Sequence, residues 1–366
     1  MIPLAKPHID KKDIKEVKKV LKSGCLSLGP KIKEFEKRFA DYIGTNHAIA
    51  VSSGTAGLHL CMKALKIKKG DEVITTPFSF IASSNVIVHE NAKPVFVDIE
   101  KETKNIDPNK IESAITKKTK AILPVHIFGE SCDMGKITKI AEKHNLPIIE
   151  DACEAIGTTY NGEKVGTFGK ASVFAFYPNK QMTTGEGGIV CTNDEKLYSQ
   201  LTSLRNQGRA SMGWLEHDIV GYNYRLNELS CSLGITQIKK IDFLLNERKK
   251  VAEKLTKSLK NIPGITQLPK LTSGKSWFVY TINLDKKYNR DEIIKELENH
   301  GIQTRPYLPA IHLQKAYKEL FNYKGGEFPV CEEASNTSIA LPFYIGLKNK
   351  EINHIKRTLK KILKNE

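Results

Sequence analysis

Hydrophobic residues gather in short runs along the first two thirds of the chain. An apolar run without polar alternation is typical of a strand covered on both faces, as in a mainly parallel sheet between helices. Seven segments are predicted to be strands, and several of them have this pattern: HAIAVSS (47–53), DEVITTP (71–77), AKPVFVDI (92–99), KAILPVHIFG (120–129), LPIIEDA (146–152), ASVFAFY (171–177) and GGIVCT (187–192). The pattern predicts an α/β domain with a seven-stranded, mainly parallel sheet.

Helical periodicity separates these strands. The amphipathic segment 55–70 ends at Gly70, and glycine is favoured where a helix is capped at its C-terminus. From residue 235 onward, apolar positions recur at helical spacing up to Pro263, which cannot continue a helix. We therefore expect one long helix in this second segment.

A second domain is predicted after the long sheet-forming part of the chain. Its elements are a strand at 277–284 and helices at 290–301 and 350–364. At this length, two domains are more common than one. We expect a large α/β domain at residues 1–235 and a smaller C-terminal α+β domain at 236–366.

The net charge of +16 changes this picture little. Lysines occur in dispersed pairs, mixed with Glu and Asp at helical spacing, and no block of five or more is present. Such a distribution is typical of solvated helix faces, with some attraction for an anionic substrate. No helix-turn-helix pattern or basic stripe supports binding to nucleic acid.

Membrane and metal chemistry receive no support from the sequence. No stretch approaches the roughly 18 apolar residues of a membrane span, and the start MIPLAKPHIDKKD lacks the apolar core of a secretory signal, so we expect a cytoplasmic protein. The seven cysteines stand singly with no C-x-x-C pair, so neither disulfides nor a metal site is expected.

Three short segments could carry chemistry. SSGTAGL (52–58) follows a predicted strand and opens a helix, which places hydroxyls and free amides where an anion such as phosphate can bind. A simple N-capped turn would have the same pattern. Asp151 ends a buried strand, where a carboxylate requires a cationic partner unless it only caps the next helix.

The third segment is FAFYPNKQMTTGEGG (174–188), in which Lys180 follows an aromatic, strand-like run. Partial burial favours a neutral lysine, which can attack a carbonyl to form a Schiff base. A single lysine is more often a surface charge. Together, however, the three segments match the needs of pyridoxal phosphate: a lysine for its aldehyde, a carboxylate for its ring nitrogen and amides for its phosphate.

The order of these segments also resembles fold type I of the pyridoxal-phosphate enzymes, and the chain resembles the DegT/DnrJ/EryC1/StrS family of nucleotide-sugar aminotransferases. The similarity covers about residues 1–350. The segments that carry it are IPLAKPHID, LGPKIKEFEKRFADYIG, AVSSGTAGLHL, PFSFIASSNVI, PVFVDIE, PVHIFGESCDM, EDACEAIGTTYNGEKVGTFG, FYPNKQMTTGEGG, GYNYRLNELSCSLGITQ, GIQTRPYLPAIHLQ and FPVCEEASNTSIALPFYIGL.

The resemblance implies a function for each matching residue. Lys180 would bind the cofactor aldehyde and move the reaction's proton, while Asp151 would pair with the ring nitrogen. The other implied cofactor contacts are Glu154 at the ring hydroxyl, Phe80 stacked on the ring, Gly54, Thr55 and Ala56 at the phosphate, and Asn223 reaching the phosphate from a second subunit of a homodimer.

The implied reaction moves an amino group from L-glutamate to a keto group of a nucleotide-linked deoxy sugar, with C4 favoured over C3. Cationic and polar candidates for binding the nucleotide sugar are Arg225, Arg305, Tyr307 and His312. Alternatives are an inosose aminotransferase and a regulatory family member. A sugar 3-dehydratase would carry histidine at the Schiff-base position, and Lys180 argues against that activity.

One position departs from the family pattern. Many members have a phosphate-binding serine five residues before the lysine, whereas this chain has Ala175. A hydrogen bond to a charged group is worth roughly 1.5–3 kcal/mol, so we expect weaker cofactor binding unless Asn179, Thr55 or a water replaces the serine.

Overall fold

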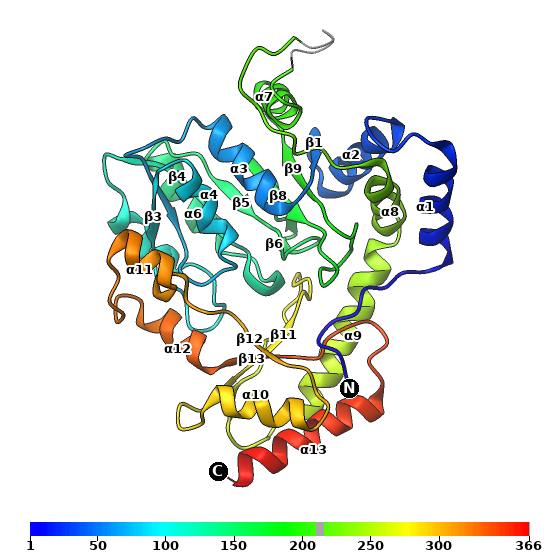
Figure 1. Cartoon of the computed structure of the whole chain (residues 1–366). Coiled ribbons are helices and arrows are strands. Elements are labelled where there is room, and N and C mark those ends of the chain that lie inside the picture. Colours follow the sequence, from blue (N-terminus) through cyan, green and yellow to red (C-terminus); the bar gives the residue numbers. More distant parts are fainter. Residues whose placement is uncertain (210–215, 366) are drawn as a thin grey trace.

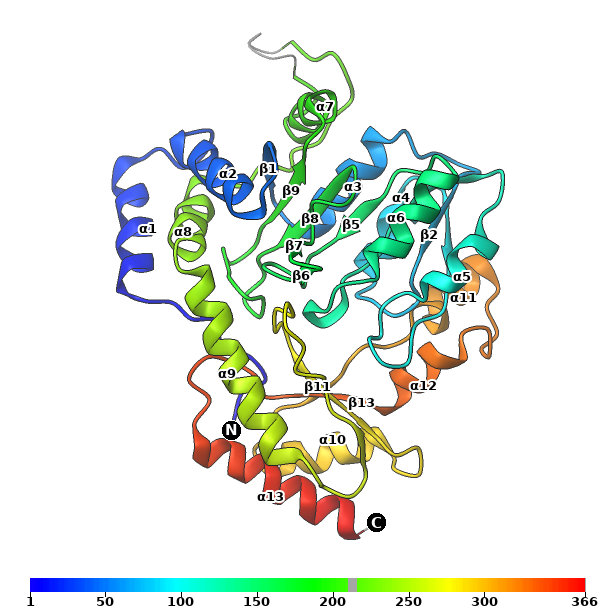
Figure 2. The same cartoon turned by 180° about the vertical axis from the view of Figure 1, so that it is seen from behind.

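The computed structural model describes residues 1–209 and 216–365, which form two bodies (Figure 1). The upper body in this view holds a central sheet between helices, and the lower body holds a smaller sheet against long helices. Helix α9 (Ile241–Leu259) runs from one body into the other, as the reverse view also shows (Figure 2). Its first turn packs in the core of the larger body, and its last three turns pack in the core of the smaller one.

The central sheet consists of two ladders. Their orders are β1-β9-β8-β5 and β3-β2-β4, and isolated parallel bridges from Ile122 to Ile148 and from Val125 to Asp151 connect them. Among the described strands of these ladders, only β9 is antiparallel to its neighbours. The mainly parallel sheet is confirmed, whereas a single sheet of seven strands stays a prediction. The strands are β1 (His47–Val51), β2 (Glu72–Thr75), β3 (Lys93–Phe96), β4 (Thr119–Ile122), β5 (Ile149–Asp151), β8 (Ala171–Ala175) and β9 (Gly188–Thr192).

Helices cover both faces of this sheet, because successive side chains of a strand point to opposite faces. In β1, Ile49 and Val51 pack toward one helix layer, whereas Ala48 and Ala50 pack toward the other. The first layer contains α3 (Gly54–Ala64), α4 (Ala82–His89) and α7 (Glu195–Arg205). The second contains α2 (Pro30–Ile43), α5 (Pro108–Ile111), α6 (Met134–Lys143) and α8 (Glu228–Ile238).

The smaller body has an antiparallel sheet of order β10-β11-β13-β12. Its core also includes Ile2, which bridges to Ile302, so the start of the chain belongs to this body. The predicted division at residues 235 and 236 stays a prediction. The elements are β10 (Ile265–Gln267), β11 (Tyr280–Leu284), β12 (Arg305–Pro306), β13 (Ser338–Leu341), α10 (Arg290–Asn299) and α13 (Asn349–Asn365).

Shorter elements complete the described chain. An N-terminal helix lies against α8, α11 packs on Phe96 of β3, α12 lies near β11, and a small hairpin follows β5. These elements are α1 (Lys11–Ser23), α11 (Lys315–Phe321), α12 (Pro329–Thr337), β6 (Thr159–Tyr160), β7 (Glu163–Lys164) and the 3-10 turns η1 (Glu112–Ala114), η2 (Ile127–Gly129) and η3 (Ile311–Leu313).

Two helix boundaries differ from the sequence-based expectation. Helix α3 ends at Ala64, and the chain turns at Lys66 with a φ of 57°, which brings Ile67 into the core. Gly70 therefore lies in the following turn and does not cap the helix. The predicted helix from residue 235 is two helices, because the backbone of Lys240 leaves the helical region between α8 and α9.

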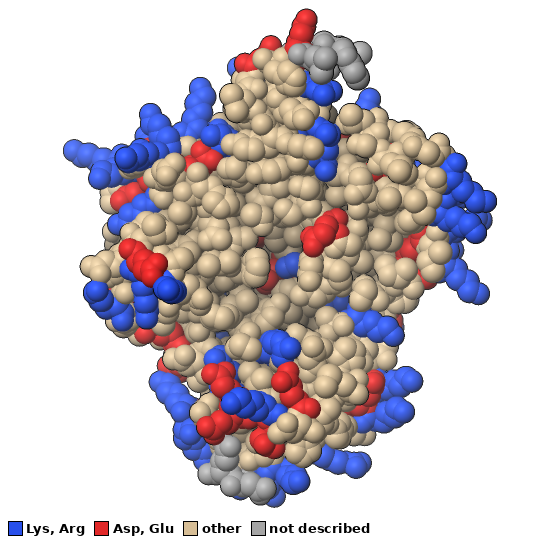
Figure 3. All heavy atoms as spheres, viewed as in Figure 1, with Lys and Arg blue, Asp and Glu red and all other residues tan. Residues whose placement is uncertain are grey.

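The charged surface fits the dispersed pattern of the sequence. On the face drawn in Figure 3, basic side chains lie mostly around the rim, and the middle carries few charges and is hollowed. Among the described helices, none is both long enough and apolar enough to cross a bilayer.

Candidate active site

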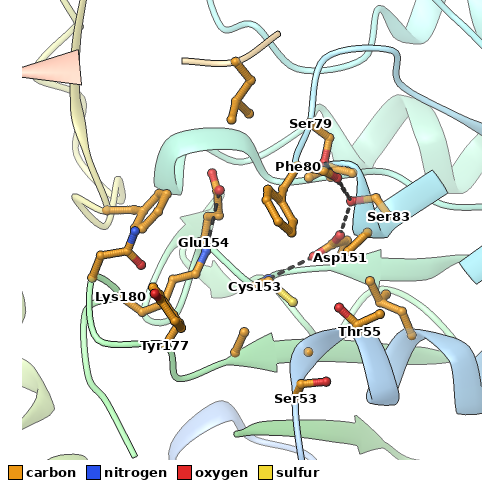
Figure 4. Close-up of a pocket in the computed structure, with 18 of the residues that line it drawn as sticks. Ser53, Thr55, Ser79, Phe80, Ser83, Asp151, Cys153, Glu154, Tyr177 and Lys180 are labelled. Carbon is orange, nitrogen blue, oxygen red and sulfur yellow. Dashed lines mark hydrogen bonds and ion pairs between the residues drawn. The ribbon is translucent and has the colours of Figure 1, made fainter. Parts of the chain in front are cut away.

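A cavity of about 360 Å³ lies between the two bodies, beside the carboxyl ends of β5 and β8 (Figure 4). This is the edge at which open α/β sheets bind ligands. The larger body contributes most of the lining, and the smaller body contributes Phe278, Tyr307 and Leu308. The cavity brings together Gly54, Thr55, Phe80, Asp151, Glu154, Ala175, Asn179, Lys180 and Tyr307, all of which the sequence analysis singled out.

One wall of the cavity is the N-terminus of α3. The Ser53 hydroxyl accepts a hydrogen bond from the Ala56 amide at 3.0 Å, which caps the helix. Within the described residues, the Gly54 and Thr55 amides have no recorded acceptor. Free amides and the helix dipole make this end an anion site. Ala56 does not line the cavity, and its amide is used by the cap.

Glycine is required at position 54 because α3 lies close to β8. A Cβ atom there would lie 2.8 Å from both the Ala175 Cβ and the Cys153 Sγ. These distances are shorter than real side-chain contacts allow. The small residues at 54 and 175 therefore let the helix end approach the strand end and face the cavity.

Asp151 lies at the end of β5 and is 4% exposed. Backbone hydrogen bonds from its amide to Pro124 and from His126 to its carbonyl hold it at the strand end. Its Oδ2 accepts from the Ser83 hydroxyl at 2.6 Å, and its Oδ1 accepts from the Cys153 amide at 3.1 Å. No basic side chain of the described chain lies within ion-pair distance of it. A buried carboxylate with only neutral partners suits a cationic ligand.

The Lys180 amine faces the same cavity (Figure 4). Its side chain is 13% exposed, and its Nζ lies 3.6 Å from Glu154 Oε1. The same atom lies 4.0 Å from the centre of the Phe278 ring. The lysine that the sequence analysis singled out is therefore held between an acid of the larger body and an aromatic ring of the smaller one.

Glu154 is buried, and its Oε2 accepts a hydrogen bond from the Phe128 amide at 2.9 Å. Burial raises the pKa of the Glu154 carboxyl, and the nearby Lys180 amine opposes that shift. Burial also raises the pKa of Tyr307, and Glu154 adds to the increase. The pKa of Glu154 therefore depends on the charge of the Lys180 amine.

Two aromatic side chains are unusually exposed at the cavity. Phe80 is 63% exposed and Tyr177 is 52% exposed, and both line it. Figure 4 shows the Phe80 ring beside Asp151 and within the cavity. Leaving such rings uncovered is unfavourable unless a ligand packs on them.

Several lining residues escaped the sequence analysis. They are Ser79, Ser83, Cys153, Tyr177, Glu186 and Phe278. Cys153 and Tyr177 lie within three residues of Asp151 and Lys180, so proximity in sequence could have indicated them. Ser83 and Phe278 come from distant segments and carry no local signal. Only tertiary structure brings them to the site.

Four further residues expected at the site do not line this cavity. Asn223 is exposed on a segment that pairs with Ser52 through Tyr224, and Arg225 donates to Asn206 at 2.9 Å. Arg305 pairs with Glu298 of α10. His312 is buried and contacts Glu332 Oε1 at 3.0 Å. Their predicted contacts with phosphate or nucleotide sugar stay predictions.

The sequence and the fold are similar to those of known proteins. Residues 7–360 match the DegT/DnrJ/EryC1/StrS aminotransferase family. GDP-perosamine synthase of Vibrio cholerae is 37% identical over 98% of this chain and 98% of its own length.

Solved structures agree with this similarity over the whole chain. PseC of Helicobacter pylori, an aminotransferase involved in the biosynthesis of pseudoaminic acid, has a TM-score of 0.95 and 31% identity, with 100% of both chains covered. Spr1654 of Streptococcus pneumoniae in its PMP form has a TM-score of 0.94 and 28% identity, again with 100% of both chains covered.

Proposed function

Because this chain belongs to the DegT/DnrJ/EryC1/StrS aminotransferase family, whose members depend on pyridoxal phosphate, and is a sugar aminotransferase, we propose that it moves an amino group from L-glutamate to C4 of a nucleotide-linked keto deoxy sugar. The observation that carries the proposal is the convergence of Lys180, Asp151 and the α3 N-terminus on one cavity. The preference for C4 rests on the resemblance of residues 301–314 and 328–347 to enzymes that aminate this carbon.

The residues of the cavity fit pyridoxal phosphate by their chemistry. Asp151 is buried and has no cationic partner in the described part of the chain, as suits a carboxylate that meets a protonated ring nitrogen. The Gly54 and Thr55 amides suit a phosphate, and Phe80 offers an exposed aromatic face. The Ala175 side chain has no donor, so the helix amides and the nearby Asn179 would replace the serine of other members. Among the residues that the structure describes, Asn179 Oδ1 is buried and has no hydrogen-bond partner.

When bound, pyridoxal phosphate supplies an aldehyde for amines and an electron sink for the carbon that loses its proton. Lys180 Nζ would carry this proton between the substrate carbon and the aldehyde carbon of the cofactor, because it is the amine that faces the cavity. Glu154 Oε1 would hold the lysine amine in place between these transfers. Phe278 and Tyr307 would exclude water from the same side.

Contacts to the nucleotide sugar would come from outside the cavity of one protomer. We propose a homodimer in which Asn223 of one subunit completes the phosphate site of the other. The exposure of Asn223 is compatible with such a contact. Arg225, Arg305 and His312 stay proposed as contacts of the nucleotide sugar, while Tyr307 already lines the cavity.

The lysine assignment is tested on the purified protein with bound cofactor. Borohydride treatment followed by peptide mass mapping should fix the cofactor on Lys180. Lys180→Ala should lose the visible absorbance band and all transamination. Binding of pyridoxal phosphate without transamination of any keto sugar would favour the regulatory family member, and modification of another lysine would refute the assignment.

The substrate assignment needs a panel of keto sugars, with L-glutamate as donor and mass as the readout. UDP-, GDP- and dTDP-linked 3-keto and 4-keto deoxy sugars should be compared, together with an inosose. We expect turnover to be highest with a 4-keto sugar. Turnover of the inosose alone would instead establish the inosose aminotransferase, and exclusive use of 3-keto sugars would refute the C4 preference.

A further inference from the structure

Two serines lie behind Asp151 on the side away from Lys180. Ser83, near the start of α4, donates to Asp151 Oδ2 at 2.6 Å, and the Ser79 hydroxyl lies 2.7 Å from the Ser83 hydroxyl. Ser79 is 3% exposed and Ser83 is 2% exposed, and both line the cavity (Figure 4). The two hydroxyls therefore form a buried chain that ends on the carboxylate.

The donor in each of these hydrogen bonds follows from the number of hydrogens that each group carries. A serine hydroxyl has one hydrogen to donate, and a carboxylate can only accept. Since Ser83 donates to Asp151, the hydrogen in the contact between the two serines must come from Ser79. Contacts of both hydroxyls with the Phe80 carbonyl, at 3.1 and 3.2 Å, are longer and compete for the same hydrogens. The favoured order is Ser79 to Ser83 to Asp151.

The linked hydrogen bonds from the two serines help to fix the orientation of the Asp151 carboxylate. The Ser83 hydroxyl holds Oδ2 and the Cys153 amide holds Oδ1, so Asp151 cannot rotate without breaking one of the two bonds. Each oxygen keeps a further lone pair for a ligand. Donation from Ser79 strengthens the bond from Ser83, because linked hydrogen bonds polarise one another.

We propose that Ser83, supported by Ser79, is a positioning residue that aims Asp151 at a protonated ring nitrogen of the ligand in the cavity. The inference rests on the proposed function, because that ligand is pyridoxal phosphate. Ser83 acts through the carboxylate rather than on the reacting atoms. Its effect must therefore depend on whether the ligand has a ring nitrogen.

The test compares two ligands on the apoprotein. One is pyridoxal phosphate, and the other is its analogue with C–H in place of the ring nitrogen. A hydrogen bond to a charged group corresponds to roughly a tenfold change or more in a dissociation constant. Ser83→Ala should weaken binding of pyridoxal phosphate by about that factor and leave the affinity for the analogue unchanged.

The chain provides a matched control in the next residue. Ser84 is also buried on α4, but it does not line the cavity or contact Asp151. Ser84→Ala should leave both affinities unchanged. Ser83→Thr keeps the hydroxyl, so it should still bind pyridoxal phosphate more tightly than the analogue. Ser79→Ala should reduce that preference to a smaller extent, and it carries the test if Ser83→Ala fails to fold.

The outcomes separate this inference from the proposed function. If Ser83→Ala weakens the binding of both ligands equally, the serine only packs in the wall of the cavity. An unchanged ratio of the two affinities would likewise overturn the inference. Failure of the unaltered protein to bind pyridoxal phosphate at all would instead refute the proposed function.

Discussion

Lys180 and Glu154 form a close pair at the site, and both side chains are largely buried. The amine lies 3.6 Å from the carboxylate and over the ring of Phe278. Burial raises the pKa of the Glu154 carboxyl, and the Lys180 amine opposes that rise. The charge on the Glu154 carboxyl therefore depends on the neighbouring amine.

Glu154→Gln should change how the stability of the apoprotein depends on pH. Burial raises the pKa of Glu154 above the value of 4.5 that it has when unfolded, so the protonated form is favoured in the folded state. The unaltered protein then loses stability as pH rises from about 4.5 through the raised folded pKa. The free energy of unfolding can be measured by urea titration. Over this pH range, the value for Glu154→Gln should increase relative to that of the unaltered protein as pH rises.

Above the folded pKa, the difference between the two proteins should become constant. A difference that does not vary with pH would show that the pKa of Glu154 is not raised in the folded protein. Glu186→Gln is the control, because Glu186 also lines the cavity but is exposed. Its substitution should leave the pH profile unchanged.

Residues of the site differed in how well the sequence could predict them. Asp151 and Lys180 each follow a strand with a distinct local pattern, and both face the cavity. Arg305 and His312 have equally distinctive neighbours in sequence, yet they pair with Glu298 and Glu332. A cation's partner depends on which acid the fold brings near, and this cannot be read from spacing along the chain.

At the scale of the element, the break between α8 and α9 shows what periodicity misses. Apolar positions continue across the break, with Ile238, Ile241 and Leu244 all buried, so the sequence predicts one helix. The backbone bends at Lys240, whose amine lies 2.6 Å from Asp13 and 2.7 Å from Asp10. The break between α8 and α9 thus coincides with an ion pair to acids that lie more than 200 residues earlier in the sequence.

Lys240→Met should release the N-terminal helix α1 from α8. Asp13 is 1% exposed, and removing one partner of a buried ion pair costs about 3 kcal/mol or more. We expect a loss of about 3 kcal/mol in the free energy of unfolding near neutral pH, measured by urea titration. The neighbouring Lys239 is exposed, so Lys239→Met should change stability by about 0.5 kcal/mol at most.

The loss of stability caused by Lys240→Met should be smaller at acidic pH. The hydrogen bond from Lys240 lowers the pKa of Asp10 from 3.8 to about 2. A lowered pKa adds stability above the unfolded value, and this stability is lost as pH falls from 3.8 toward 2. The difference between the unaltered protein and Lys240→Met should therefore decrease below about pH 4. An equal loss at every pH would exclude the ion pair as its cause.

At the scale of the whole molecule, a few hydrogen bonds join the two bodies beside the cavity. Ser276 of the smaller body donates to the Gly129 carbonyl at 3.1 Å, and its hydroxyl accepts from Thr158 and Gln181. Arg248 donates to the carbonyls of Trp277 and Phe278 at 2.6 Å each. This junction fixes Phe278 under the Lys180 amine.

Gly129→Ala should open this junction. Gly129 has a φ of 79°, and a Cβ atom there would lie 1.4 Å from the Ser276 carbonyl oxygen. The two bodies would have to separate, and we expect a loss of about 3 kcal/mol in stability, with faster amide exchange over residues 276–284.

Gly162 provides the matched control for this substitution. Its φ is 90°, but nothing lies within 4 Å of the position of its Cβ. Gly162→Ala should cost only the left-handed backbone strain, about 1 kcal/mol. Equal effects of the two substitutions, measured by thermal unfolding, would mean that backbone strain rather than the junction explains the loss.

Mixing two inactive variants tests the proposed dimer. If Asn223 serves the neighbouring subunit, a mixed dimer of Lys180→Ala and Asn223→Ala chains has one intact site. Random mixing should then recover about a quarter of the unaltered activity, as expected for an interface with twofold symmetry. Absence of recovery, with mixed dimers verified by mass, would place Asn223 in the site of its own chain.

The bridge between Ile2 and Ile302 has a consequence for synthesis on the ribosome. Ile302 is synthesised some 300 residues after Ile2, so the bridge between them can form only late in translation. The strands that pair in the larger body are synthesised earlier. The smaller body therefore closes last, and until then Ile2 lacks the core that buries it. Phe278 also arrives in this final stage, so the wall that confines the lysine amine is completed only when translation nears its end.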